Sequence, residues 1–428
     1  MILLGTLLLM LPVASEAGTV TSPLTALFVS TSAVSTTGLS PVDTADHWSA
    51  FGEAVVLALI QFGGLGFMAL ATLALLLLRR RLSLATRAAT AETLGRLGIE
   101  QPGATGRIVR RVIGGSLLVE LVGTLALLLV FIANGTWDGG SAVWRATFTA
   151  LSAFNTAGFD IEGAGAGLTG ESTNAGLIAV VLALSILGGT GYAIWADVLA
   201  RRSRHRLAID TKLVFLGIAL SWIGGSAMVL FLEAGSGEAL GSGFERVTNA
   251  TFTAISGGTT VGFSTINVGA LRETTAILLI ALMFVGAAPA STAGGIKITT
   301  WAVLLFTMIA SLRGADHVNA FRREIAWTYV NRALTAALLG VAISFGVGLL
   351  LTAFTATNSL NLIFEGVSAF GTVGLSRGVT AELTLPSQAV VIVAMFLGRV
   401  GPLSLALVFV RQGQPARYRY AQEAVSIG

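Results

Sequence analysis

The sequence predicts an all-α membrane protein in which four repeats with pseudo-fourfold symmetry surround one central pore. Each repeat consists of a transmembrane helix, a re-entrant pore helix, a filter loop and a second transmembrane helix. Composition is the first observation behind this prediction: of 428 residues, 54% are hydrophobic and 11% are charged, whereas soluble domains carry about 25% charged residues. The other two are apolar segments that recur along the whole chain and a short phrase that returns four times.

Segment lengths separate spanning from re-entrant helices, because a membrane-spanning helix needs roughly 20 predominantly apolar residues. Candidates of this length lie at 52–78, 108–133, 174–199, 212–232, 274–312, 326–355 and 385–411. The first segment, Met1–Ala14, is shorter, and its place in the repeat predicts a spanning helix that is shortened or lacks its beginning. Four apolar stretches are too short to span and suit re-entrant helices, at 22–34, 141–153, 244–256 and 358–370.

Charged residues predict the orientation in the membrane. Basic residues cluster in alternate connections, with arginine runs at 79–81 and 201–206 and further arginines in the tail, while the opposite connections carry acids such as Asp43 and Asp160. Lys and Arg accumulate on the cytoplasmic side, so we expect a multi-pass protein of the cytoplasmic membrane with both termini in the cytoplasm. We interpret the arginine runs as solvated loops, since no basic module that would bind nucleic acid is visible.

The repeated phrase contains one glycine in each copy. The copies read Val-Ser-Thr-Thr-Gly-Leu-Ser (34–40), Phe-Asn-Thr-Ala-Gly-Phe-Asp (154–160), Thr-Thr-Val-Gly-Phe-Ser-Thr (259–265) and Phe-Gly-Thr-Val-Gly-Leu-Ser (370–376). Their glycines, Gly38, Gly158, Gly262 and Gly374, are separated by 120, 104 and 112 residues. Self-similarity at a long period indicates repeats, which we place at 1–80, 105–201, 210–312 and 324–411, followed by a cytoplasmic tail at 412–428.

Four glycine loops around one axis have a specific chemical use. Non-helical backbone at membrane depth is tolerated where it is buried or lines a watery cavity, and glycine adopts positive φ without steric cost. Rings of backbone carbonyls then replace the hydration shell of a potassium ion, with the C-terminal ends of the short helices aimed at the pore. The predicted K+-binding residues are Ser35, Thr36, Thr37, Gly38, Asn155, Thr156, Ala157, Gly158, Thr259, Thr260, Val261, Gly262, Gly371, Thr372, Val373 and Gly374. Glycines that serve packing alone are the alternative, but four at matched positions are hard to obtain by chance.

These phrases, together with the stretches 61–68 and 395–403, resemble the membrane subunit of the Trk/Ktr/HKT superfamily of potassium transporters, of the KtrB and TrkH type. The resemblance covers nearly the whole chain and implies potassium uptake. Relatives with serine at the first filter glycine tend to admit sodium, so glycine at all four positions favours potassium selectivity. The chain departs from the family's pattern in two places: its first helix is short, and it reads Gly-Gly-Thr-Gly-Tyr at 188–192, where the family usually has Gly-Gly-Leu-Gly-Phe. We expect little consequence from the second departure.

The resemblance also implies partners. Relatives are homodimers with one pore in each protomer, and they dock on a cytoplasmic ring of nucleotide-binding subunits of the RCK or KtrA type. The chain itself is expected to bind no cofactor besides the transported K+. The sequence leaves three points open. It does not say whether transport depends on Na+ or H+, with Na+ as an activator, or whether transport is channel-like or coupled. It also does not identify the regulatory nucleotide.

The predicted spanning helix that follows the third filter loop, 274–312, is interrupted by Pro289 and several glycines, which break helices. The phrase Ser-Thr-Ala-Gly-Gly-Ile-Lys at 291–297 is similar to the family's gating loop, so we expect an intramembrane loop that obstructs the pore; a simple kink is the alternative. Lys297 would hold the loop, repel cations from the closed pore, or extend to the cytoplasmic interface. The predicted gate residues are Gly286, Pro289, Ser291, Thr292, Gly294, Gly295, Lys297 and Arg399.

Arg399, Glu120 and Glu365 lie inside predicted membrane segments, where charges are rare and usually functional. Arg399 is expected on the permeation path, as the resemblance implies, with a structural ion pair to Glu120 or another buried acid as the alternative; Glu120 is expected to be structural. Glu365 is expected to stabilise the positive N-terminal end of its short helix. The hydroxyls of the filter threonines are expected to satisfy loop backbone groups.

Two other function classes compete with ion conduction. An ion-coupled transporter of another small solute usually has broken helices in corresponding halves, whereas here only one repeat has a break that the sequence reveals. An enzyme is not expected, because His47, His205 and His317 all lie in predicted loops and cannot activate a serine within a span. The chain has no cysteine, which excludes disulfides and thiolate metal sites.

Overall fold

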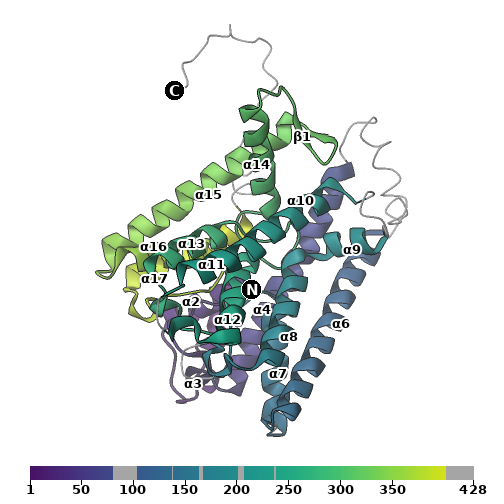
Figure 1. The fold of residues 1–428 in the computed structure, drawn as a ribbon. Coiled ribbons are helices and arrows are strands. Elements are labelled where there is room, and N and C mark those ends of the chain that lie inside the picture. Colours follow the sequence, from purple (N-terminus) through teal and green to yellow (C-terminus); the bar gives the residue numbers. More distant parts are fainter. Residues whose placement is uncertain (81–103, 137, 163–166, 201–206, 236–237, 402–428) are drawn as a thin grey trace.

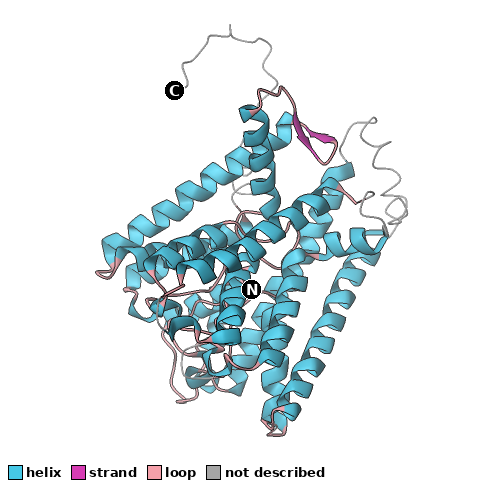
Figure 2. Ribbon diagram, viewed as in Figure 1, coloured by secondary structure: helices cyan, strands magenta, loops and turns pink. Residues whose placement is uncertain are grey.

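The computed structural model describes residues 1–80, 104–136, 138–162, 167–200, 207–235 and 238–401, and these are mostly helical (Figures 1 and 2). Within them, four helices are long and apolar enough to cross a membrane, over Ala50–Ala69, Val109–Ala133, Ile209–Leu232 and Trp327–Phe354. Large apolar side chains such as Leu118 and Phe345 are exposed along these helices, at 61% and 70%. Lipid is the solvent that such surfaces require.

In the first half of the chain, the elements up to residue 80 are α1 (Ile2–Leu9), the 3-10 turn η1 (Pro12–Ala14), α2 (Pro23–Ser35), α3 (Thr44–His47) and α4 (Ala50–Arg80). From residue 104 they are α6 (Ala104–Ala133), α7 (Gly140–Phe154), η2 (Thr169–Glu171), α8 (Ala175–Thr190) and α9 (Tyr192–Ala200). The helices labelled α4, α6 and α8 lie roughly parallel or antiparallel to one another (Figure 1).

The second half repeats this alternation of long and short helices. Its third group is α10 (Ile209–Ile218), a π-helical turn η4 (Ala219–Gly224), α11 (Gly225–Leu232), η5 (Glu238–Leu240), α12 (Gly243–Thr259), η6 (Val268–Ala270), α13 (Glu273–Phe284) and α14 (Ile298–Leu312). The last group is α15 (Trp327–Phe354), α16 (Ser359–Gly371), η7 (Thr380–Glu382) and α17 (Leu385–Val400).

The short helices α2, α7, α12 and α16 are packed among the longer helices. Each packs between the helices before and after it in the chain, as α7 does between α6 and α8 and α16 does between α15 and α17. Each also carries one phenylalanine with no exposed surface, ten residues before the repeated glycine: Phe28, Phe148, Phe252 and Phe364. These buried rings fix the depth of the short helices in the core.

One predicted span is not a single helix. The sequence predicts an unbroken span over 174–199, but α8 and α9 meet at an angle of 88°. Gly191 joins them with φ +74°, and a Cβ atom there would lie 2.8 Å from the backbone oxygen of Ala290. The prediction was wrong because a glycine in this conformation lets α9 turn beneath another segment of the chain, and the Gly-Gly-Thr-Gly-Tyr stretch therefore coincides with a sharp bend.

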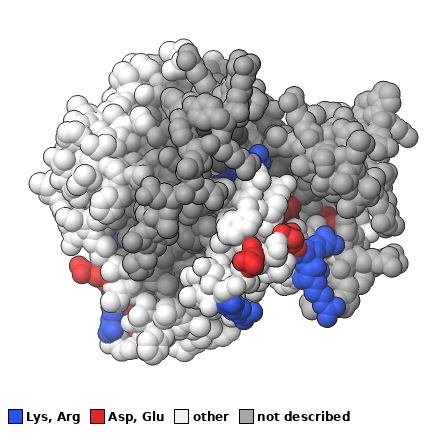
Figure 3. Space-filling model, turned by 90° about the horizontal axis from the view of Figure 1, so that it is seen from above, with Lys and Arg blue, Asp and Glu red and all other residues white. Residues whose placement is uncertain are grey.

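Two further details differ from the sequence prediction or lie beyond it. Strands β1 (Val318–Ala320) and β2 (Arg323–Ile325) form an antiparallel hairpin next to α14, so the fold is not purely helical. The last predicted span, 385–411, is described as far as residue 401, and the predicted tail at 412–428 lies outside the described residues. Among the residues that Figure 3 does not draw in grey, the charged side chains stand in a few groups surrounded by uncharged residues.

Candidate permeation site

The four ring segments, 35–38, 155–158, 259–262 and 371–374, come together at the ends of the short helices. Their glycines all have positive φ, at +90°, +67°, +80° and +93° in chain order. A Cβ atom built on each glycine would lie 2.1–2.4 Å from the backbone oxygen that precedes the next glycine. The pairs are Gly38 with Ala157, Gly158 with Val261, Gly262 with Val373, and Gly374 with Thr37. The fourth pair closes on the first, so the glycines form a closed ring in which no side chain fits; we call it the glycine ring.

The residue two positions before each ring glycine is a threonine in the left-handed conformation. The φ angles are +54°, +52°, +60° and +49° for Thr36, Thr156, Thr260 and Thr372. A β-branched residue rarely adopts positive φ, and such strain persists where the surroundings enforce it. The enforcing contact is the same in all four: the next amide bonds to the carbonyl five residues earlier, as Thr37 N does to Ser32 O at 2.8 Å. This bond is the mark of a Schellman-type helix end.

A set of serines beneath the ring was missed in the sequence. Ser152 Oγ donates to Phe159 O at 2.7 Å, and Ser256 Oγ donates to Phe263 O at 2.6 Å. In the fourth segment Ser368 Oγ accepts the amide of Gly374 at 3.1 Å. A serine stands six residues before every ring glycine, including Ser32, so the constant offset was the signal. The hydroxyls of Ser152, Ser256 and Ser368 tie the outgoing chain back to its own short helix, whereas that of Ser32 is buried with no hydrogen-bond partner among the described residues.

Between α13 and α14 the chain forms a non-helical loop, 285–297, that lies against the ring segments. Thr292 is central: its hydroxyl donates to Phe154 O at 3.2 Å and accepts from Thr156 Oγ1 at 3.3 Å. Its carbonyl accepts from Thr36 Oγ1 at 3.3 Å. A Cβ atom on Gly294 would lie 2.0 Å from Thr372 Oγ1. The loop therefore contacts the threonines of three ring segments.

The 285–297 loop is mostly buried and is held by hydrogen bonds. Gly286, Ser291, Thr292, Gly294 and Gly295 are buried, and Pro289 is partly buried. The amide of Ala288 donates to Gly189 O at 3.0 Å, next to the bend between α8 and α9. Lys297 Nζ donates to Ala293 O at 2.8 Å and to Gly294 O at 3.1 Å. The ammonium group thus engages the loop itself.

Arg399 on α17 joins the loop to the first ring segment. Its side chain donates to Thr36 Oγ1 at 2.8 Å, to Gly63 O at 2.8 Å, and also to Thr292 O. The guanidinium lies 4.5 Å from the ring centre of Phe67, and the residue is 7% exposed. The alternative of an ion pair with Glu120 is wrong, because Glu120 instead accepts from Gln61 and Asn155. Distance along the sequence does not show which side chains meet in the fold, so the partners of Arg399 and Glu120 could not be predicted from it.

The chain that forms these ring segments and this loop matches a known family. The family model described as "TrkH: Cation transport protein" matches residues 2–418. The chain belongs to this family. It is 34% identical over 436 residues to the potassium/sodium uptake protein NtpJ of Enterococcus hirae, covering 100% of this chain and 95% of that protein. It is 35% identical over 441 residues to the Ktr system potassium uptake protein B of Bacillus subtilis, covering 100% and 94%.

The fold is shared with a solved member of the family. The crystal structure of the potassium transporter TrkH from Vibrio parahaemolyticus matches with a TM-score of 0.67 and 17% identity, over 95% of this chain and 84% of that one. Membership in this family, with several apolar helices, makes the chain a multi-pass membrane transporter, and confirms that it is not an enzyme.

Glu365 has hydrogen-bond partners other than the helix N-terminus that was predicted for it. It is the seventh residue of α16, whose N-terminus is capped by the Asn358 side chain. Its carboxylate accepts from Ser376 Oγ at 2.7 Å and also from Thr380 Oγ1. The prediction that Glu365 stabilises the helix N-terminus was wrong, because the chain after the glycine ring folds back and brings two hydroxyls to this buried acid.

The threonine hydroxyls of the ring segments divide into two kinds. Those of Thr36 and Thr156 donate to backbone oxygens, to Thr292 O at 3.3 Å and Asn155 O at 2.7 Å. Those of Thr260 and Thr372 are buried with no hydrogen-bond partner among the described residues. The expectation that these hydroxyls satisfy loop backbone groups therefore describes the first two segments only.

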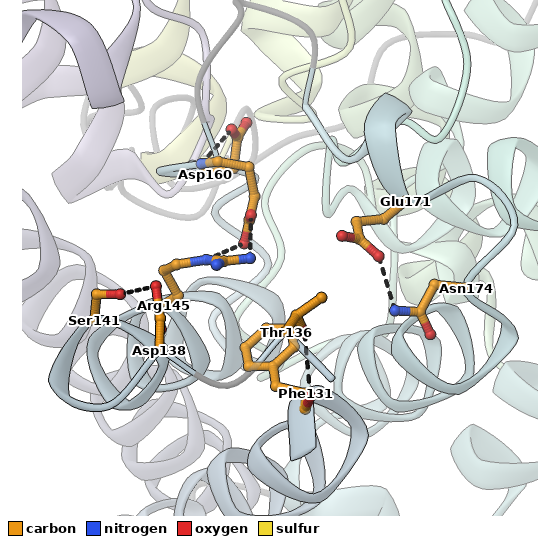
Figure 4. Close-up of polar contacts among 9 residues, drawn as sticks. Phe131, Thr136, Asp138, Ser141, Arg145, Asp160, Glu171 and Asn174 are labelled. Carbon is orange, nitrogen blue, oxygen red and sulfur yellow. Dashed lines mark hydrogen bonds and ion pairs between the residues drawn. The ribbon is translucent and has the colours of Figure 1, made fainter. Parts of the chain in front are cut away.

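The chain beyond the glycine ring carries charged residues, shown for the second segment in Figure 4. Arg145 Nη2 pairs with Glu162 Oε2 at 2.7 Å, while Asp160 Oδ1 accepts the Glu162 amide at 3.4 Å. Burial raises the pKa of Asp160 to about 7; the backbone hydrogen bond opposes this, and the nearby carboxylates of Asp43 and Glu162 add to it. Ser40, Ser264 and Ser376 stand at the matching positions, so the second segment alone has an acid there.

Proposed function

We propose that this chain carries K+ across the cytoplasmic membrane through the glycine ring, with both termini on the cytoplasmic side. The observation that carries the proposal is the closed ring: four glycines with positive φ, each against the carbonyl before the next. The names of the relatives from Enterococcus hirae and Bacillus subtilis, a potassium/sodium and a potassium uptake protein, agree with this ion.

In the proposed mechanism, the ring segments form a selectivity filter. Backbone carbonyls of the four segments would replace the hydration water of K+, and the four left-handed threonines turn the chain out of each short helix toward the ring. The repeats would be those expected from the sequence, at 1–80, 105–201, 210–312 and 324–411. Their support is the recurrence of the same threonine, glycine, serine and phenylalanine offsets in all four copies.

The 285–297 loop would be the gate. It contacts three of the four ring threonines from one side, and the guanidinium of Arg399 places a positive charge beside it. A cation that leaves the filter would meet both the loop and this charge. Opening would require the loop to leave Thr36 and Thr156.

A cytoplasmic partner would control this movement. The "Ktr system" in the name of a relative implies that its protein works with another subunit, and we propose a ring of nucleotide-binding subunits and a homodimer of this chain. The loop continues directly into α14, and α14 packs against the β1–β2 hairpin. A force on this end of α14 would reach the loop through one helix.

Potassium uptake by a bacterial strain that lacks its own uptake systems tests the proposal. We expect the wild type to restore growth at low potassium and Gly38→Ser to lose discrimination against Na+, because a side chain at φ +90° would meet Ala157 O. Gly18→Ser is the matched control, since Gly18 also has positive φ, at +66°, but nothing within 4 Å. Absence of K+ flux through the purified wild type in liposomes would refute the function, and assays with and without Na+ test Na+ as an activator.

A further inference from the structure

A buried carboxylate stands behind the second ring segment, in a closed triangle of three side chains. Glu120 of α6 is 2% exposed. Its Oε2 accepts from Gln61 Nε2 at 2.7 Å, and its Oε1 accepts from Asn155 Nδ2 at 3.0 Å. Asn155 Nδ2 also faces Gln61 Oε1 at 2.8 Å. The three residues come from α4, α6 and the end of α7, so the triangle links three helices at the entry to the ring segment.

The other three segments have no such link. The residues that match Asn155, three before the ring glycine, are Ser35, Thr259 and Gly371. Ser35 Oγ bonds to Thr31 O at 2.7 Å, and Thr259 Oγ1 bonds to Ile255 O at 2.8 Å, both within their own short helix. Gly371 has no side chain. Asn155 is therefore the one residue at this position whose side chain reaches two neighbouring long helices.

The chemistry of the triangle fixes the amide of Asn155 in one orientation. A carboxylate accepts hydrogen bonds, and both neighbouring amides donate to it; hydrogen bonds to a charged group are the stronger kind. Asn155 Oδ1 has no hydrogen-bond partner in the described part of the chain, and it lies where a Cβ atom of Gly64 would be 2.0 Å away. A larger residue at 64 would push the amide out of place. An ionisable residue inside the membrane is expensive to retain, which favours a functional reason for Glu120.

We propose that Glu120 is a positioning residue for K+ selectivity, which through Asn155 and Gln61 holds the second ring segment at the distance from the pore axis that dehydrated K+ requires. The inference rests on the proposed function. Thr156, the next residue after Asn155, carries the left-handed turn of this segment. A shift of Asn155 therefore moves the carbonyls of Thr156 and Ala157 directly. Na+ is smaller than K+, so a loosened segment would admit it.

Single and double substitutions test the triangle. Glu120→Gln places an amide donor against the donors of Gln61 and Asn155, and Asn155→Asp places two carboxylates together. The double variant Glu120→Gln/Asn155→Asp again has one carboxylate and one amide, with their positions exchanged. Thr124→Val is the control on the same helix, because Thr124 Oγ1 bonds only to Glu120 O, at 2.9 Å, within α6.

The measurement is Rb+ uptake into liposomes containing the purified full-length protein, with competition by K+ or Na+. We expect each single variant to strengthen Na+ competition about tenfold, as expected for the loss of a hydrogen bond to a charged group, while the maximal rate changes less. The double variant should return most of the selectivity, and Thr124→Val should match the wild type. Size-exclusion elution shows whether each variant is folded.

The outcomes separate this inference from the proposed function. If the wild type carries no Rb+ or K+, the proposed function is wrong. If the wild type carries them and the folded single variants keep wild-type selectivity, the role of Glu120 is refuted while the function stands. The role of Glu120 is also refuted if the folded double variant is as permissive to Na+ as the single variants. This comparison can still be made with Asn155→Asp if Glu120→Gln alone does not fold.

Discussion

The glycine ring and the 285–297 loop lie against each other but are held in opposite ways. Each ring segment is fastened by backbone bonds to its own short helix, as Thr37 N is to Ser32 O. The loop is fastened to elements distant in the sequence, by its backbone, as Ala288 N is to Gly189 O, and by side chains, as Thr292 O is by Thr36 and Arg399. Bonds within one helix end break only when that end unfolds, whereas bonds between distant elements can break while each element stays folded. This difference favours the proposal that the ring stays in place while the loop moves.

The largest effect is expected where the ring is broken. Gly374 has φ +93°, and a Cβ atom there would lie 2.1 Å from Thr37 O; this closes the ring between the last and first segments. Gly374→Ala should therefore abolish K+ flux in liposomes. Gly378→Ala in the same stretch is the control, since Gly378 has φ +90° but open space around it. The control should lose stability by about 1 kcal/mol and keep its flux.

Equal flux in these two variants would mean that the contact between neighbouring ring segments is irrelevant to permeation. Positive φ, which both glycines have, would then be enough to explain the effect of an alanine, and the contact of Gly374 with Thr37 O would have no role in the flux.

A smaller effect, of opposite sign, is expected at the side chain that holds the loop. Arg399→Gln removes the charged donor that joins Thr292 O to Thr36 and Gly63. Hydrogen bonds to charged groups contribute roughly 1.5–3 kcal/mol, so the open population should rise by about tenfold or more. Basal K+ flux in liposomes without any partner protein measures this rise.

Arg377→Gln provides the matched control for that experiment. Arg377 likewise donates to backbone oxygens, those of Val268, Gly269 and Leu271, none of which belongs to the 285–297 loop. Its removal should leave the basal flux unchanged. If both variants raise the flux equally, general loosening of the fold rather than release of the loop is the cause.

The smallest effect is expected from one neutral hydroxyl. Thr292→Val keeps the shape of the side chain and removes its bonds to Phe154 O and Thr156 Oγ1. A neutral hydrogen bond contributes about 0.5–1.5 kcal/mol, so basal flux should rise about threefold. Thr307→Val, whose hydroxyl bonds only to Val303 O within α14, should have no effect. A larger rise for Thr307→Val than for Thr292→Val would contradict the role of the loop.

Some parts of this molecule could be predicted because they are properties of a short stretch of chain. The lengths of the four short helices follow from apolar stretches bounded by turns, and the interruption after α13 follows from Pro289 and its neighbouring glycines. The bend at Gly191 was missed, since a helix tolerates a glycine and only the neighbouring Ala290 shows why φ is positive there. Glu365 was misplaced because its partners, Ser376 and Thr380, lie beyond a turn.

The sequence by itself determined that the chain lies in a membrane and that four equivalent glycines recur, because hydropathy and spacing are written along the chain. Only the tertiary structure decided which polar groups meet. Arg399 reaches Thr36 across 363 residues, and Glu120 turns to Gln61 and Asn155 rather than to Arg399. In an apolar interior every buried charge must find a partner, but which partner is near depends on how all the helices pack together.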